Sequence, residues 1–143
     1  MSEPDDERES LQRIPFFAEL SREDVDGILA VGSRVTFEPG STIVEQGSPG
    51  DGMYVVLSGT AEVDVGGRYH KMGPGDFFGE MALITSRTRM ATVKSADRVD
   101  ALKIPAEGFR SFLLDHPAVA ISMLEAIVER LREVEQRIDA WMA

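Results

Sequence analysis

The chain has 143 residues, no cysteine and a formal net charge of −10, and its length fits one domain with its own apolar core. An acidic surface repels phosphate backbones and anionic lipid headgroups, so this charge argues against direct binding to nucleic acid. The lack of cysteine excludes disulfides and thiolate metal sites and fits the cytoplasm, and the lack of a run of about 18 apolar residues argues against a membrane span.

The N-terminal residues divide into a tail and a helical segment. Residues 1–10, MSEPDDERES, are polar and acidic and lack the apolar core of a secretory signal, so they predict a disordered tail. Residues 11–33 predict a short apolar turn around Phe16 and Phe17, followed by a helix over 21–30. Ser21 suits the N-cap of that helix, and Glu23 and Asp24 place acids in its first turn.

Residues 34–105 change to short β-type segments separated by glycine and proline turns. Between residues 61 and 65, apolar side chains alternate with Glu62 and Asp64, which predicts a strand with one buried and one exposed face. The segments MATVKS and VDALKIP add two further strands. Strands of about five residues with such frequent turns favour an antiparallel roll or barrel over βαβ units.

Residues 106–143 return to helical periodicity. A helix is predicted over 106–115, ended by His116-Pro117, and a long helix over 118–141. Apolar residues of the long helix fall on heptad a and d positions: Ile121, Leu124, Val128, Leu131 and Ile138. The residues that widen this stripe are Ile127, Val134 and Trp141. Two interpretations stay open, because the stripe can pack on its own domain or bind a partner helix as well.

The segment FFGEMALITSRTRMATV, residues 77–93, has the chemistry of an anion site. Gly79 allows a ligand to approach the backbone, and a single helical turn over residues 80–83 presents partly positive N–H groups. Arg89 can pair with the same anion, whereas the Glu80 carboxylate can only accept, for example from a sugar hydroxyl. The two together suit a ribose phosphate. The alternative is that Glu80 caps the turn, and that Arg89 is a surface cation paired with Glu80.

The chain resembles the cyclic nucleotide-binding domains found in the catabolite activator protein, protein kinase A regulatory subunits and cyclic-nucleotide-gated channels. The resemblance rests on FEPGSTIVEQGSPGDGMYVVLSGTAEV and GPGDFFGEMALITSRTRMATV, of which the second matches the phosphate-binding cassette of that family, here residues 77–93. It implies an α+β fold with a jelly-roll-like β-roll of about eight strands, flanked by an N-terminal helix, a short cassette helix and C-terminal helices.

The resemblance also implies a ligand and its site. The ligand is cyclic AMP, and the site consists of Gly79, Glu80, Met81, Ala82, Arg89, Met90 and Ala91. Glu80 would accept from the ribose 2′-hydroxyl, Arg89 would pair with the phosphate, and the amides of Gly79, Ala82 and Met90 would donate. Replacing Arg89 by alanine should weaken binding and leave the melting of the ligand-free protein nearly unchanged.

Two residues depart from the family pattern. Thr88 stands where proline is frequent, and Met90 stands where Ala, Ser or Thr is frequent. Met90 has no hydroxyl for the guanine amino group, so cyclic GMP should bind more weakly.

The family further implies that the C-terminal helix moves when ligand binds, covers the base and pairs two copies of the chain. The candidates to cover the base are Leu131, Val134 and Trp141, and the dimer candidates are the five heptad residues above. Trp141 is the only tryptophan, so its emission should report the movement. The resemblance is also compatible with a downstream effector domain joined to such a sensor.

Other function classes fit less well. A metal-dependent enzyme of the cupin type needs clustered histidines, and this chain has only His70, expected on a strand surface, and His116, expected at a helix end. No Ser-His-Asp or paired-carboxylate arrangement stands out, so no enzyme activity and no metal are expected. The chain could still be the sensor of a larger transcription regulator, channel, transporter or enzyme, or a β-roll that has lost its ligand.

Overall fold

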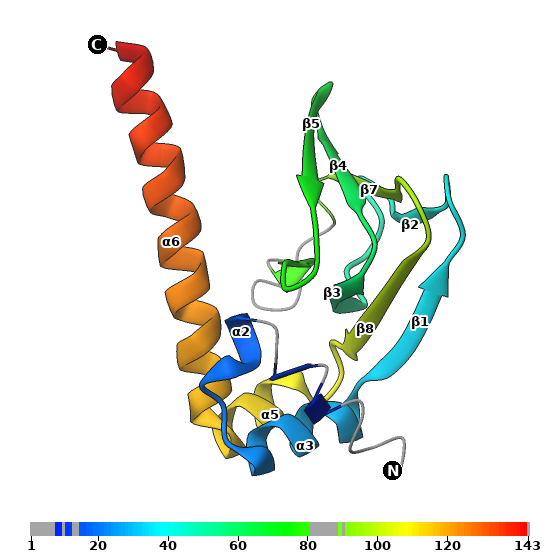
Figure 1. Cartoon of the computed structure of the whole chain (residues 1–143), viewed down its shortest axis with the longest axis vertical. Helices are drawn as coiled ribbons and strands as arrows, with labels where there is room; N and C mark the ends of the chain where they lie inside the picture. Colours follow the sequence, from blue (N-terminus) through cyan, green and yellow to red (C-terminus); the bar gives the residue numbers. More distant parts are fainter. Residues whose placement is uncertain (1–7, 10, 13–14, 81–88, 90, 143) are drawn as a thin grey trace.

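The computed structural model describes residues 8–9, 11–12, 15–80, 89 and 91–142 (Figure 1). Within its helices and strands, the side chains of residues 15, 16, 65, 134 and 137–142 are not described. Some predicted residues therefore lie outside the described part of the chain, namely Met81, Ala82 and Met90. For others only the backbone is described, namely Phe16, Val134, Ile138 and Trp141.

In the described part of the chain, eight strands form two antiparallel four-stranded sheets, as predicted for a β-roll. The strand bounds are β1 (Ser33–Phe37), β2 (Thr42–Val44), β3 (Gly52–Ser58), β4 (Ala61–Val65), β5 (Arg68–Met72), β6 (Phe77–Phe78), β7 (Thr92–Ser95) and β8 (Val99–Pro105). One sheet has the order β1-β8-β3-β6 and the other has the order β2-β7-β4-β5. The predicted strands at MATVKS and VDALKIP are β7 and β8.

Strand β3 lies between two apolar clusters, which explains its unbroken apolar run MYVVL. Met53 and Val55 pack into a cluster shared with the helices, while Tyr54 and Val56 pack into the interior of the roll. Successive side chains of a strand point to opposite faces, so a strand covered on both sides must be apolar at every position. The first sheet is therefore the layer that joins the roll to the helices.

Four helices are described with full bounds: α2 (Pro15–Ala18), α3 (Arg22–Val31), α5 (Phe109–Asp115) and α6 (Pro117–Met142). In α3, Ser21 is the N-cap as predicted, because its Oγ accepts from the backbone N–H of Asp24 at 3.1 Å. Figure 1 shows α3 and α5 across one end of the roll, with α6 rising from them to the C-terminus.

The predicted bounds of the C-terminal helices need correction. Helix α5 begins at Phe109 and not at residue 106, because Gly108 has a φ of 78° and is the N-cap. A left-handed residue cannot continue a right-handed helix, so it sets the start. Helix α6 begins at Pro117, since proline suits the first helical position, where its missing N–H costs nothing.

The end of the predicted tail differs from expectation. Arg8 and Glu9 are helical, and Arg8 Nε donates to the Asp26 carboxylate of α3 at 2.7 Å. This ion pair attaches the N-terminal segment to the helical layer, a contact that the polar composition of residues 1–10 did not predict.

Helix α6 has two apolar faces. Val119 and Met123 are buried in the cluster beneath the roll, and Ala126 and Ile127 pack against that cluster. The opposite face exposes Ile121, Leu124, Val128 and Leu131, with 43–60% of each residue accessible. The stripe predicted from the sequence is therefore wider than the domain itself covers.

No single helix in the described part of the chain is long and apolar enough to cross a membrane. Helices α5 and α6 meet that test only as a pair bent by 107°, which is weak support for a span.

Candidate functional site

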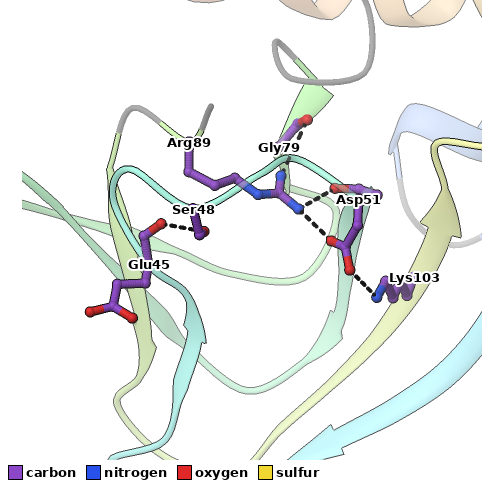
Figure 2. A network of polar contacts seen from close by, with 7 residues as sticks. Glu45, Ser48, Asp51, Gly79, Arg89 and Lys103 are labelled. Carbon is purple, nitrogen blue, oxygen red and sulfur yellow. Dashed lines mark hydrogen bonds and ion pairs between the residues drawn. The ribbon is translucent and has the colours of Figure 1, made fainter. Parts of the chain in front are cut away.

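The Arg89 side chain lies inside the protein and only 5% of the residue is exposed. Its Nη2 donates to Asp51 Oδ1 at 3.1 Å and to the Gly52 carbonyl at 2.6 Å, and its Nη1 lies 3.4 Å from the Gly79 carbonyl (Figure 2). Asp51 lies directly before β3, Gly52 is the first residue of β3, and Gly79 directly follows β6. The guanidinium thus joins two segments that are far apart in the sequence.

The backbone of Arg89 is also fixed. The Arg89 N–H donates to the Ser48 carbonyl at 2.8 Å, and the Gly47 N–H donates to the Arg89 carbonyl at 2.9 Å. This pair of reciprocal bonds holds the residue against the turn between β2 and β3. Residue 89 therefore has a defined position and direction.

Gly79 has a positive φ of 89°. A Cβ at this position would lie 2.3 Å from Arg89 Nη1 and 3.0 Å from the Gly52 carbonyl oxygen. The left-handed conformation and the close approach of the guanidinium both require glycine. Gly79 is thus part of the space that admits Arg89.

Asp51 binds two cations. Its Oδ2 accepts from Lys103 Nζ at 3.0 Å while its Oδ1 accepts from Arg89. The pKa of Asp51 is lowered, first because Lys103 donates to it and, to a smaller degree, because of the charges of Lys103 and Arg89. A lowered carboxyl pKa stabilises the fold above about pH 4, and that contribution is lost as the pH falls further.

Glu80 pairs with an arginine of the long helix. Arg130 Nη1 donates to Glu80 Oε1 at 2.9 Å, and Arg130 Nη2 donates to the Phe77 carbonyl at 2.5 Å. The guanidinium also lies over the Phe77 ring at 4.2 Å from its centroid. Helix α6 is therefore attached to the start of the cassette through the carboxylate expected to bind ribose.

A cavity of about 640 Å³ opens beside this ion pair, between the β5–β6 region and α6. Its lining includes His70, Phe77, Glu129 and Arg130. His70 lies exposed on β5, as expected for a strand-surface residue.

The alternative in which Arg89 is a surface cation paired with Glu80 is wrong, since Arg89 is buried and bonded to Asp51, and Glu80 is bonded to Arg130. Ala91 lies directly before β7 and is half-buried. Leu131 is exposed and does not cover the roll in this structure. Met81, Ala82 and Met90 lie outside the described residues.

The buried position of Arg89 changes one expectation from the sequence. Its removal would leave the Gly52 and Gly79 carbonyls and one Asp51 oxygen without this donor. Loss of a buried donor costs about 1–3 kcal/mol. We therefore expect Arg89→Ala to lower the melting temperature of the ligand-free protein, and not to leave it nearly unchanged.

Sequence reasoning missed Asp51, Lys103 and Arg130. Asp51 lies in the sequence PGDG, which indicates a turn, and Arg130 is one of several charged residues on the long helix. Neither local pattern indicates a functional side chain. Among the described residues, no group of three or more His, Asp or Glu side chains could hold a metal ion.

Residues 34–116 match the family model of the cyclic nucleotide-binding domain. The chain belongs to this family. A cAMP-dependent protein kinase regulatory subunit of Aspergillus fumigatus is 34% identical over 72% of this chain and 26% of its own length. A cyclic nucleotide-gated potassium channel of Mesorhizobium japonicum is 32% identical over 82% of the chain and 33% of its own length.

A solved structure of the same family agrees. The catabolite activator protein of Thermus thermophilus has a TM-score of 0.76 and 30% identity, covering 87% of this chain and 62% of that one. The chain thus spans from about a quarter to less than two thirds of the length of these relatives. Members of this family are regulatory domains that bind cyclic nucleotides, and they occur in proteins of different overall function.

Proposed function

We propose that this chain is a cyclic AMP sensor in which Arg89 binds the cyclic phosphate and Glu80 accepts from the ribose 2′-hydroxyl. The observation that carries the proposal is the buried, fixed guanidinium of Arg89 directly beside Gly79 and the start of the cassette. A guanidinium has five N–H donors, more than the three contacts described above, so it can also meet a phosphate oxygen.

The remaining cassette roles complete this proposed site. Gly79, Met81, Ala82, Met90 and Ala91 would line the ribose phosphate, with backbone N–H groups of Gly79, Ala82 and Met90 as donors. Backbone N–H groups at the start of a helical turn suit an anion because they point at it and carry partial positive charge. A ribose phosphate is consistent with the opposite roles of Glu80 and Arg89, one acceptor and one cation.

Glu80 supplies a physical link from the ligand to α6. A carboxylate has about four acceptor positions, so Glu80 can accept from a ribose hydroxyl while it also binds Arg130. A ligand that draws Glu80 toward the roll would act on Arg130 and therefore on the position of α6. We infer that binding shifts the population of α6 positions, and that Leu131, Val134 or Trp141 covers the base in the shifted state.

Two other functions remain as alternatives, a sensor within a larger protein and a β-roll that has lost its ligand. The relatives are longer than this chain, so it can serve a transcription regulator, a channel, a transporter or an enzyme as their sensor. A β-roll without ligand binding is less well supported, because both Glu80 and Arg89 are present. The cytoplasmic location stays a prediction.

Titration calorimetry of the purified chain with cyclic AMP and cyclic GMP tests the function. We expect cyclic AMP to bind about tenfold more tightly, the scale of one ordinary hydrogen bond, because the Met90 side chain has no hydroxyl for the guanine amino group. Met90→Thr should raise the cyclic GMP affinity, and Thr88→Ser serves as a matched control. No heat and no thermal shift at millimolar cyclic AMP would rule out the function, and equal affinities would rule out the selectivity.

We also propose that two copies pair through the exposed face of α6, with Ile121, Leu124, Val128, Leu131 and Ile138 at the contact. Replacing Leu124 and Val128 together by aspartate should weaken association by roughly a hundredfold or more, since burial of one such side chain contributes about 1.5–3 kcal/mol and symmetry counts it twice. Leu114→Asp is the matched control, because Leu114 is 77% exposed on α5 and off this face. Sedimentation that shows only monomer at high micromolar concentration would reject the dimer.

A further inference from the structure

His116 stands at the elbow between α5 and α6 and contacts helix α3. It is the C-cap of α5, and α6 begins at the next residue after a bend of 107°. Its Nδ1 lies 2.9 Å from Asp24 Oδ1, although the two residues are 92 positions apart. Both side chains are mostly buried, with 18% of His116 and 14% of Asp24 exposed.

Gly27 of helix α3 leaves space for the His116 imidazole. A Cβ at Gly27 would lie 2.9 Å from His116 Cε1 and Nε2, and 3.1 Å from the Phe112 ring. The imidazole also packs on Phe112, with 4.7 Å between ring centroids. Glycine inside a helix costs about 1 kcal/mol relative to alanine. The space for His116 gives a physical reason for glycine at this helical position.

Asp24 is the charged group that faces His116. The other charged residues of α3 and α5 are exposed: Arg22, Glu23, Asp26, Arg110 and Asp115. Asp26 is paired with Arg8, and the first charged residue of α6 is Glu125, two turns beyond the elbow. The pKa of Asp24 is lowered, chiefly because His116 hydrogen-bonds to it, so the carboxylate stays ionised above about pH 4.

We propose that His116, Asp24 and Gly27 form a proton-sensitive latch that fixes the direction of α6 relative to α3. Histidine is the side chain that changes charge between about pH 5 and 8, and a charge-assisted hydrogen bond is roughly twice as strong as a neutral one. The latch is therefore stronger when the imidazole is protonated than when it is neutral. Helix α6 has 26 residues, about 39 Å, so a small rotation at the elbow displaces its far end by many ångströms.

The test measures the elbow directly and without ligand, so it does not depend on the proposed nucleotide site. The chain has no cysteine, which allows spin labels at Ala30→Cys on α3 and Arg132→Cys on α6, both exposed. We expect one main interspin distance at pH 5.5 and, at pH 8.5, an increase of about fivefold in the ratio of a second distance to the first. An identical distance distribution at both pH values would overturn the proposal.

Two variants separate the latch from a general effect of pH. His116→Gln keeps a polar group but does not titrate, so the pH response should disappear. Gly27→Ala keeps both titrating groups but displaces the imidazole, and it should also abolish the response. Circular dichroism verifies that each variant keeps its helical content. A response that survives in His116→Gln would exclude His116 as its origin, and one that survives in Gly27→Ala would exclude the packing geometry.

Discussion

Replacing Arg89 by alanine is expected to weaken cyclic AMP binding by about 30-fold to several thousand-fold. The range follows from the roughly 2–5 kcal/mol that loss of one partner of a desolvated charge pair costs, at about 1.4 kcal/mol per decade. The guanidinium is buried beside Gly79 and has a fixed direction, so no other described cation takes its place at that position. Titration calorimetry measures the loss.

The effect on folding must be separated from the effect on binding, because Arg89 also holds Asp51 and two carbonyl oxygens. Asp51→Ala is the matched control. This variant removes the Asp51 carboxylate, and with it the bond between Asp51 and Lys103, but it keeps the Arg89 guanidinium. We expect both variants to melt at lower temperature without ligand, and only Arg89→Ala to lose most of its affinity at a temperature where both are folded. An unchanged affinity in Arg89→Ala would place the phosphate elsewhere.

The second large effect is expected for Glu80. Glu80→Ala should weaken cyclic AMP binding by roughly ten- to a hundredfold, since a hydrogen bond to a charged group contributes about 1.5–3 kcal/mol. Wild-type protein should bind 2′-deoxy-cyclic AMP more weakly than cyclic AMP by a similar factor. In Glu80→Ala the two ligands should bind nearly equally, because the acceptor for the 2′-hydroxyl is gone. Competition titration of both nucleotides gives the ratio.

Arg130→Ala distinguishes this role from the structural role of Glu80. The variant breaks the ion pair to α6 but keeps the Glu80 carboxylate, so the ratio between the ribose and deoxyribose ligands should stay as in wild type. Its absolute affinity is expected to change, because the link between the cassette and α6 is lost. A ratio near one in Arg130→Ala would mean that Glu80 acts through Arg130 and does not contact the hydroxyl.

Local patterns in the sequence determined a large part of the fold. The alternation in residues 61–65 predicted β4, the Ser21 signal predicted the start of α3, and the heptad stripe predicted a long apolar-faced helix, although only the structure shows that part of the stripe is exposed. The family resemblance predicted a cassette over residues 77–93 with Glu80 and Arg89. Each of these signals depends on residues close together in the chain, where backbone periodicity and capping act directly.

Only the tertiary structure decided which side chains meet. Asp51 and Arg89 are 38 positions apart, Glu80 and Arg130 are 50 apart, and Asp24 and His116 are 92 apart. A helical or strand period predicts which face a residue lies on, but it does not predict which distant segment covers that face. These contacts depend on how the first sheet packs against both the second sheet and the helices, and that packing is a property of the whole chain.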